Sequence, residues 1–228
     1  MLNVVYEDNQ VIVVVKPHNQ PSQEDSSKDP DLLSEVKQYV KEKYNKPGEA
    51  FIGLVHRLDR PTGGLMVFAR TSKAAARLSK QISEHETEKK YYAVVEGFVR
   101  EKKATLVNYL KKDEKTNMVK VVTQTETGAK KAELEYTLLD TKGDLSLLEV
   151  SLKTGRSHQI RVQLGARNIP IYGDQKYNTK TKGKTLALWA GRLSFEHPTT
   201  KEKMSFVASP DTSKAPWNKF FLDKIFMR

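Results

Sequence analysis

The chain has 228 residues, of which 39 are lysine or arginine and 28 are aspartate or glutamate, so its formal net charge is +11. Hydrophobic residues make up 38%, and there are only 12 glycines and 9 prolines, which excludes collagen-like, low-complexity and wholly disordered chains. The absence of cysteine excludes disulfides, thiolate catalysis and cysteine-bound zinc.

The sequence contains no membrane or export signal. No apolar run approaches the ~20 residues of a membrane helix, and no basic region followed by an apolar stretch opens the chain. We therefore expect a cytoplasmic protein without a membrane partner. The positive charge favours polyanionic partners, because lysine and arginine placed on phosphates release condensed counterions. The alternative is a basic protein without such a partner.

The first part of the chain predicts a hairpin and a helix. Residues 4–16 form two apolar runs around the polar turn 7–10, which is typical of a β-hairpin, and a polar loop follows. Residues 31–44 place apolar side chains at helical spacing, and the Asn-Lys-Pro-Gly stretch 45–48 ends this helix.

A second helix is predicted over 72–83, with Ser72 as its N-cap and with Ala75, Leu78 and Ile82 buried. Five β-type segments, separated by glycine-rich or charged turns, are then expected over 91–95, 104–110, 118–123, 132–139 and 145–152.

The last part predicts a short helix over 157–164, a strand over 186–195 and a helical tail over 215–226. The apolar stripe of this tail comprises Trp217, Phe220, Phe221 and Ile225. No repeat or long linker divides the chain. An α+β domain with a large, mostly antiparallel sheet therefore fits best.

Residues 53–65, GLVHRLDRPTGGL, place Arg57 and Arg60 on either side of Asp59. Nearby guanidinium groups lower a carboxyl pKa by roughly 1–3 units. An ionised carboxylate can act as a nucleophile or stabilise a cationic transition state, and the two following glycines permit close backbone approach. The alternative is an ordinary Arg–Asp pair at a surface turn.

Residues 152–164, LKTGRSHQIRVQL, end a strand and begin a helix near Ser157. Helix N-terminal amides together with Arg156 suit an anion, either a phosphate or the Asp59 carboxylate. The alternative is that Ser157 only caps the helix, Arg161 is solvated and His158 is structural.

Residues 89–97, KKYYAVVEG, carry Tyr91 and Tyr92 next to each other on a predicted strand. Neighbouring strand residues face opposite sides, so one ring is expected in the core and the other in a cleft. An aromatic ring in a cleft can stack on a nucleobase, although a tyrosine on a strand can also serve packing alone.

The segments HRLDRPTGGL, K-x-Y-x-A at 89–93 and TGRSHQIRVQL resemble, in order, three motifs of the RluA-type pseudouridine synthases, which isomerise uridine in rRNA or tRNA. The resemblance includes Lys16-Pro17, residues 169–174 and residues 193–198. It implies an α+β fold with a central, largely antiparallel mixed sheet flanked by helices. It also implies an RNA partner and no metal or organic cofactor.

The resemblance assigns roles to five residues. Asp59 corresponds to the catalytic aspartate, and Arg156 corresponds to the basic residue that pairs with it. Tyr91 matches the residue that packs on the target base, and Ile160 falls on the apolar position beneath that base. Arg57 resembles a residue that inserts into RNA where the uridine leaves its stack.

The chain also departs from the family pattern. Serine is frequent where Gly63 stands, histidine is common where Trp189 stands, and the loop 18–21 lacks the usual Ala-Gly-rich continuation. Many relatives carry an N-terminal RNA-binding domain, whereas the catalytic-type pattern of this sequence begins at residue 1. We therefore expect one catalytic domain over 1–228 without an accessory domain, and a monomer.

Further RNA contacts are expected from His56 and Arg60 and from a run of lysines. The alternative for the lysine run is a solvated loop without a role in RNA binding. The run comprises Lys176, Lys180, Lys182 and Lys184. A uridine in structured RNA must be flipped out, at a cost of a few kcal/mol, and phosphate contacts offset that cost.

The reaction exchanges a C–N for a C–C glycosidic bond and needs neither redox change nor external energy. The chain accordingly lacks phosphate-loop and dinucleotide motifs. An arginine about 4 Å from Asp59 would contribute roughly 4 kcal/mol at an effective dielectric of 20. Asp59 can attack the sugar, attack the base or remove a ribose proton, and we favour attack on the sugar.

The sequence leaves two rival functions. One is a catalytically silent RNA-binding or RNA-chaperone protein on the same scaffold, which would not need Asp59, Tyr91 and Arg156 together. The other is a nucleoside or glycoside hydrolase, which would need two facing carboxylates. Both 23S rRNA and tRNA remain open as targets.

Overall fold

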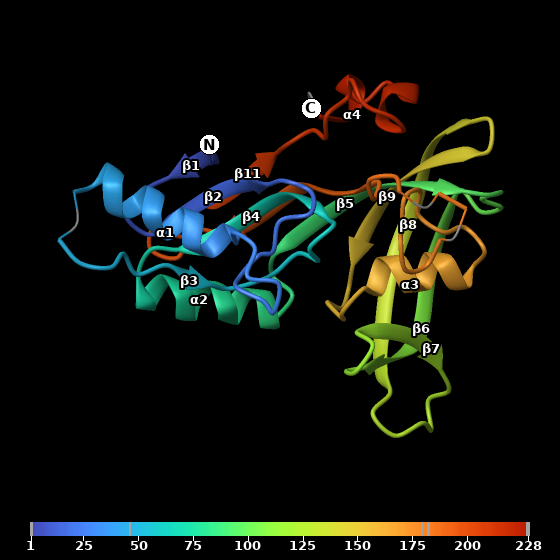
Figure 1. Cartoon of the computed structure of the whole chain (residues 1–228), viewed down its shortest axis with the longest axis horizontal. Coiled ribbons are helices and arrows are strands. Elements are labelled where there is room, and N and C mark those ends of the chain that lie inside the picture. The colour runs from blue at the N-terminus through green and yellow to red at the C-terminus, as the bar shows by residue number, and fades with distance from the viewer. Residues whose placement is uncertain (1, 46, 179, 182, 227–228) are drawn as a thin grey trace. The chain divides into compact units, whose positions relative to one another are not determined.

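The computed structural model describes residues 2–45, 47–178, 180–181 and 183–226. The chain divides into two compact units (Figure 1). Unit 1 comprises residues 1–88 and 190–208, and unit 2 comprises residues 89–189 and 209–228.

The strands of unit 1 are ordered β1-β2-β4-β10, with β3 added to β4 and β11 added to β10. Their bounds are β1 (Asn3–Glu7), β2 (Val11–Lys16), β3 (Gly53–Leu54), β4 (Gly63–Ala69), β10 (Leu188–Glu196) and β11 (Lys203–Val207). The pairs β1–β2, β2–β4, β3–β4 and β10–β11 are all antiparallel. The predicted hairpin over 4–16 is thereby confirmed.

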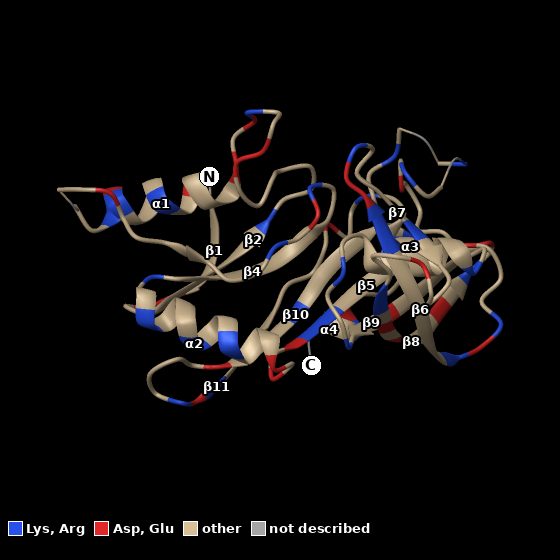
Figure 2. Cartoon of the chain, turned by 90° about the horizontal axis from the view of Figure 1, so that it is seen from below, with Lys and Arg blue, Asp and Glu red and all other residues tan. Residues whose placement is uncertain are grey.

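Two helices lie on opposite sides of these strands, α1 (Leu32–Lys43) and α2 (Ser72–Ser83), as Figure 2 shows. Every residue of β4 is buried, because both faces of this strand are covered. Its sequence is therefore apolar at consecutive positions. One of its faces joins Leu65 and Val67 to Ala74 and Leu78 of α2. The period-2 alternation of β2 and β4 thus divides the core into two layers.

Both predicted helices are confirmed, with one correction. Asp31 caps α1 by accepting from the Ser34 N–H. The N-cap of α2 is Thr71, which accepts from the Ala74 N–H, and not Ser72. The buried face of α2 is correspondingly shifted, and it comprises Ala74, Leu78 and Gln81 in place of Ala75, Leu78 and Ile82.

Unit 2 is an antiparallel sheet ordered β5-β9-β8-β6-β7. Its strands are β5 (Glu88–Glu96), β6 (Lys103–Asp113), β7 (Met118–Val122), β8 (Lys130–Lys142) and β9 (Leu145–Leu152). The helix α3 (Gln159–Ala166) covers one face of this sheet, where Val162 packs with Leu110, Val119 and Ala132. The five predicted strands are confirmed.

The predicted helical tail over 215–226 is wrong. The segment forms a 3-10 turn, Trp217–Lys219, and the one-turn helix α4 (Asp223–Phe226). Pro216 lies inside the predicted helix, and the residue before a proline is disfavoured in helical conformation. Trp217 and Phe220 are buried, but Phe221 is 79% exposed, so the predicted apolar stripe does not form.

The α+β class with a mostly antiparallel sheet is confirmed. The expectation of one catalytic domain over the whole chain stays a prediction. Among the residues that the structure describes, no helix is both long and apolar enough to span a membrane.

Candidate active site

Asp59 lies in the loop between β3 and β4 of unit 1, and a buried lysine anchors this loop. Lys16, at the end of β2, is fully buried. Its Nζ donates to the carbonyl oxygens of Pro17 at 3.0 Å, Gln20 at 2.7 Å and Arg60 at 2.9 Å. These three acceptors match the three N–H bonds of an ammonium group. Lys16 therefore ties the loop that follows β2 to the residue after Asp59.

The charge of Lys16 is coupled to the Asp59 loop. Burial lowers the pKa of Lys16 to about 7, the negative charge of Asp59 acts in the opposite direction, and the positive charge of Arg60 lowers the pKa further. Asp59 thus stabilises the ammonium form of Lys16.

The backbone on both sides of Asp59 is also held. The Ser22 hydroxyl donates to the carbonyl oxygen of Leu58 at 2.8 Å and accepts from its N–H at 3.2 Å. The N–H of Thr62 donates to the carbonyl oxygen of Asp59 at 2.9 Å. The loop is therefore a pre-formed turn with a half-buried carboxylate.

Other predicted residues of this loop have different surroundings. The Nε2 of His56 accepts from the N–H of Val67 at 3.1 Å, which joins the start of the loop to β4. Arg57 is exposed. Arg60 forms an ion pair with Asp29 and donates to the Ser27 hydroxyl at 2.9 Å. The sequence predicts that Arg57 and Arg60 lie near Asp59 and favour its ionised form, and the structure shows that the Arg60 guanidinium also binds the polar loop before α1.

Tyr91 lies on β5 of unit 2. Tyr92 is fully buried, and Tyr91 is 8% exposed; Tyr92 is therefore the core ring of the pair, and a place for Tyr91 in a cleft stays a prediction. The Tyr92 hydroxyl donates to Glu149 Oε2 at 3.0 Å, which explains its burial. Lys89 occupies the same strand face as Tyr91, and burial lowers the pKa of Lys89 to about 8.

Arg156 lies in the turn between β9 and α3. Its side chain is exposed, and its Nε donates to the carbonyl oxygen of Lys131 on β8 at 3.0 Å. The N-cap of α3 is His158, in a left-handed conformation with φ 52° and without a side-chain cap bond, so Ser157 does not cap this helix. Ile160, in the first turn of α3, is buried.

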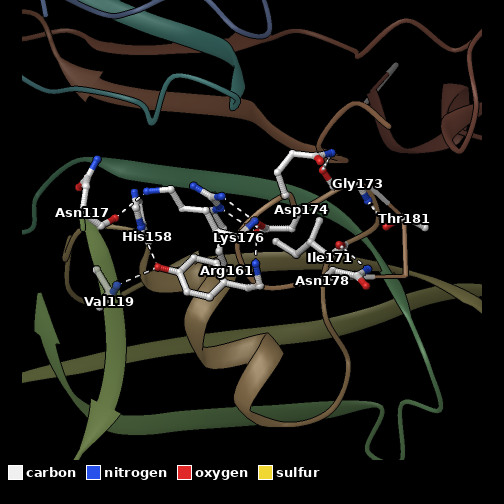
Figure 3. A network of polar contacts seen from close by, with 12 residues as sticks. Asn117, Val119, His158, Arg161, Ile171, Gly173, Asp174, Lys176, Asn178 and Thr181 are labelled. Carbon is white, nitrogen blue, oxygen red and sulfur yellow. Dashed lines mark hydrogen bonds and ion pairs between the residues drawn. The ribbon is translucent and has the colours of Figure 1, made fainter. Parts of the chain in front are cut away.

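A buried polar network joins α3 to the turn at residues 174–177 (Figure 3). Arg161 Nε and Nη2 donate to the two oxygens of Asp174 at 2.8 and 2.7 Å, and both residues are almost fully buried. Asp174 Oδ1 also accepts from the N–H groups of Lys176 and Tyr177. The interpretation of Arg161 as a solvated side chain is therefore wrong, because its guanidinium links α3 to the 174–177 turn.

The predicted lysine run follows this turn. Lys176 Nζ donates to the carbonyl oxygen of Asn117 at 2.6 Å, while Lys180 and Lys184 are exposed. Lys182 lies outside the described residues. Lysines and arginines occur on elements of both units and are interspersed with acids (Figure 2).

Comparison with known proteins identifies the family. Residues 10–166 match the family model described as RNA pseudouridylate synthase. The chain belongs to the RNA pseudouridine synthases, RluA type. It is an isomerase that acts on RNA.

Curated relatives and solved structures agree with this identification. The chain is 31% identical to an RNA pseudouridine synthase of Aquifex aeolicus over 95% of this chain and 72% of that protein. It is 31% identical to ribosomal large subunit pseudouridine synthase C of Buchnera aphidicola over 92% and 67% of the two chains. Human RNA pseudouridylate synthase domain containing 4 has the same fold, with a TM-score of 0.78, 21% identity and coverage of 92% and 89%.

Each unit of this pseudouridine synthase carries part of the predicted residue set. Unit 1 holds His56, Arg57, Asp59 and Arg60, and unit 2 holds Tyr91, Arg156, Ile160 and the lysine run. Within the described ranges, no three histidine, aspartate or glutamate side chains are grouped so that they could hold a metal ion.

Sequence reasoning missed two buried residues of these segments, Lys16 and Gln159. The match of Lys16-Pro17 to the family opening was a signal for the first. For Gln159 the signal was its place in the TGRSHQIR motif, although a buried amide cannot be told from an exposed one by sequence.

Proposed function

We propose that this pseudouridine synthase converts a uridine of structured RNA to pseudouridine, with 23S rRNA as its first candidate substrate and tRNA as the second. Large-subunit rRNA comes first because two similar proteins are named as ribosomal large subunit pseudouridine synthases. They are synthase C of Buchnera aphidicola and synthase D of Borreliella burgdorferi, the latter 35% identical over 85% of this chain and 60% of that protein.

Asp59 is the proposed catalytic carboxylate, and the observation that carries this proposal is the anchoring of its loop. Hydrogen bonds from Lys16 to Arg60 and from Ser22 to Leu58 hold the residue after and the residue before Asp59. A carboxylate on a fixed backbone needs little reorganisation to reach a reacting carbon. Arg156 is the proposed basic partner of this carboxylate.

In the proposed reaction, an Asp59 oxygen attacks the ribose C1′ and the C1′–N1 bond breaks, so uracil leaves with the bonding electron pair. The uracil turns, its C5 attacks C1′, and the ester bond to Asp59 breaks and restores the carboxylate. The proton lost from C5 balances the proton gained at N1. Tyr91 packs on the uracil ring and Ile160 lies beneath it during this rotation.

The RNA has to present the uridine outside its stack. Arg57 is exposed, as a side chain that inserts into RNA must be. His56, Arg60 and the lysines at 176, 180, 182 and 184 are the proposed phosphate and sugar contacts, which offset the cost of base flipping.

The proposal predicts that Asp59→Ala and Asp59→Asn bind RNA with the wild-type Kd but form no pseudouridine. The assay incubates the protein with unmodified 23S rRNA and, separately, with unmodified tRNA, and maps pseudouridine in each. Asp140→Ala, which removes a half-buried aspartate on β8, is the matched control and keeps full activity.

Other outcomes have defined meanings. Full activity of Asp59→Ala contradicts the catalytic role, and modification of tRNA alone replaces the first candidate substrate with the second. Binding without conversion by the wild-type protein supports the silent RNA-binding alternative. A trapped ester between Asp59 and the sugar supports attack at C1′, whereas a deuterium isotope effect at the ribose 2′ position supports proton abstraction.

A further inference from the structure

Gln159, the first residue of α3, makes a hydrogen bond directly to the backbone of Arg156. Gln159 is 3% exposed, and its Oε1 accepts from the N–H of Arg156 at 3.0 Å and from the Thr154 hydroxyl at 2.8 Å. Its Nε2 donates to the carbonyl oxygen of Glu133 on β8 at 3.0 Å. One buried amide group therefore bonds to the residue before the Gly155-Arg156 turn, to Arg156 itself and to a strand of the sheet.

Thr154 closes this cluster. Its Oγ1 accepts from the N–H of Glu133 at 2.8 Å, and the N–H groups of Lys153 and Thr154 both donate to the carbonyl oxygen of Glu133 at 3.0 and 3.2 Å. The segment that follows β9, the start of α3 and the first part of β8 are thus joined through buried and half-buried polar groups. Such a network is rigid when each member is satisfied.

The helix that carries Gln159 is itself held in place. The Arg161–Asp174 ion pair ties α3 to the 174–177 turn, and the Tyr177 hydroxyl lies 2.8 Å from His158 Nδ1 while it accepts from the N–H of Val119 (Figure 3). These contacts fix the position of α3, and therefore also the position of Gln159 relative to the turn that carries Arg156.

The side chain of Arg156 is held by the same strand. Its Nε donates to Lys131, two residues before Glu133 on β8. Within the part of the chain that the structure describes, its terminal guanidinium nitrogens have no partner, so the planar pair of N–H groups that binds a carboxylate or phosphate remains available.

We propose that Gln159 is a positioning residue of the pseudouridine synthase reaction, which acts by fixing the backbone of Arg156 so that its guanidinium is oriented before the RNA binds. This inference rests on the proposed role of Arg156. A preorganised guanidinium avoids reorganisation during the reaction, and misplacement of a reacting group by about 1 Å can lower a rate about 100-fold.

Gln163 provides a matched control in the same helix. It is also a buried glutamine, one turn further along α3, but its Nε2 donates to the Leu106 carbonyl oxygen at 3.1 Å and to Asn108 Oδ1 at 2.8 Å. These two acceptors belong to β6, and a longer bond runs to the carbonyl oxygen of Ala132 on β8 at 3.4 Å. None of the three acceptors belongs to the turn that carries Arg156. Methionine is similar in length to glutamine, so replacing either glutamine by methionine removes the buried amide group and keeps the length of the side chain.

The experiment compares Gln159→Met with Gln163→Met, each in the wild-type and in the Arg156→Ala background. The single-turnover rate constant for pseudouridine formation and the Kd for the same RNA are measured. We expect Gln159→Met to lower the rate constant about 10- to 100-fold, to leave the Kd unchanged, and to have no further effect in Arg156→Ala. Gln163→Met keeps the wild-type rate constant.

Thr154 supplies an independent pair of variants if Gln159→Met fails to fold. Thr154→Val removes the hydroxyl at nearly constant volume and should lower the rate constant in the same way, whereas Thr154→Ser keeps the hydroxyl and should restore it. Equal rate constants for the valine and serine variants overturn the inference.

The two proposals fail in different ways. A full rate constant for Arg156→Ala overturns the proposed role of Arg156, and the inference with it. A slow Arg156→Ala beside a full-rate Gln159→Met overturns the inference alone. Equal losses in Gln159→Met and Gln163→Met, or a loss that adds to that of Arg156→Ala, also overturn it, because such losses indicate a general structural role.

Discussion

Lys16 illustrates how a single residue supports the Asp59 loop. A buried ammonium group without partners costs several kcal/mol, but three backbone carbonyl groups accept its three protons. Burial still lowers the pKa of Lys16 to about 7, against about 10.4 for an exposed lysine. Lys16 is therefore both an anchor of the loop and a group whose protonation differs between the folded and unfolded states.

This difference predicts a pH dependence of stability. Between pH 7 and about 10 the unfolded chain holds the Lys16 proton while the folded chain has released it, so folding becomes more favourable as the pH rises. Lys16→Met lacks this effect. The free energy of unfolding of the wild type minus that of Lys16→Met should rise with pH by up to about 1.4 kcal/mol per unit.

Urea unfolding at pH 7.5, 8.5 and 9.5 measures this difference. Lys73→Met, which replaces an exposed lysine of α2, is the control and should show a pH profile parallel to that of the wild type. If the Lys16→Met profile were also parallel to the wild type, Lys16 would be protonated throughout this range.

At the scale of elements, the strands β4 and β10 approach each other closely at Gly64. Gly64 has φ 122°, and a Cβ added there would lie 2.3 Å from the Ala190 carbonyl oxygen and 2.5 Å from its nitrogen. Both contacts are with backbone atoms, which cannot rotate away. The second glycine of the Pro-Thr-Gly-Gly turn is therefore required by strand packing directly after the Asp59 loop.

We predict that Gly64→Ala lowers the free energy of unfolding by about 3 kcal/mol, through backbone strain and the contact with Ala190. Gly128→Ala is the matched control, because Gly128 also has a positive φ of 83° but open space around it. Its loss should be about 1 kcal/mol, the effect of the positive φ alone. Equal losses in denaturant unfolding would show that the contact with Ala190 contributes nothing.

At the scale of the whole molecule, the net charge of +11 predicts salt-dependent RNA binding. Lys180 and Lys184 are exposed in the lysine run. Each phosphate contact adds about 0.7–0.9 to the slope of log affinity against log salt. Lys180→Gln with Lys184→Gln should therefore weaken RNA binding and lower the magnitude of that slope by about 1.5.

The control for this prediction is Lys73→Gln with Lys80→Gln, which removes the same charge from the exposed face of α2. Filter binding or fluorescence titration between about 50 and 200 mM salt measures both pairs. An equal change of slope in the two double variants would indicate that only net charge matters, and an unchanged slope for Lys180 and Lys184 would place the RNA elsewhere.

The sequence by itself determined the family, the α+β class, the strands of unit 2 and both helices of unit 1. These features depend on local patterns, namely motif order, apolar periodicity and the turn residues that separate strands. The same patterns missed β4, whose continuous apolar run between motif and helix has no alternation, and they wrongly extended a helix across Pro216.

Only the tertiary structure decided which polar groups meet. Lys16 reaches the carbonyl oxygen of Arg60 over 44 residues of sequence, Arg60 binds Asp29 over 31, and Gln159 reaches Glu133 over 26. The sequence identified Arg60 as a neighbour of Asp59, yet the direction of its side chain depends on the loop folded beside it. Buried hydrogen bonds are decided by chain segments distant in sequence, because a desolvated donor must bind whichever acceptor the packed backbone brings to it.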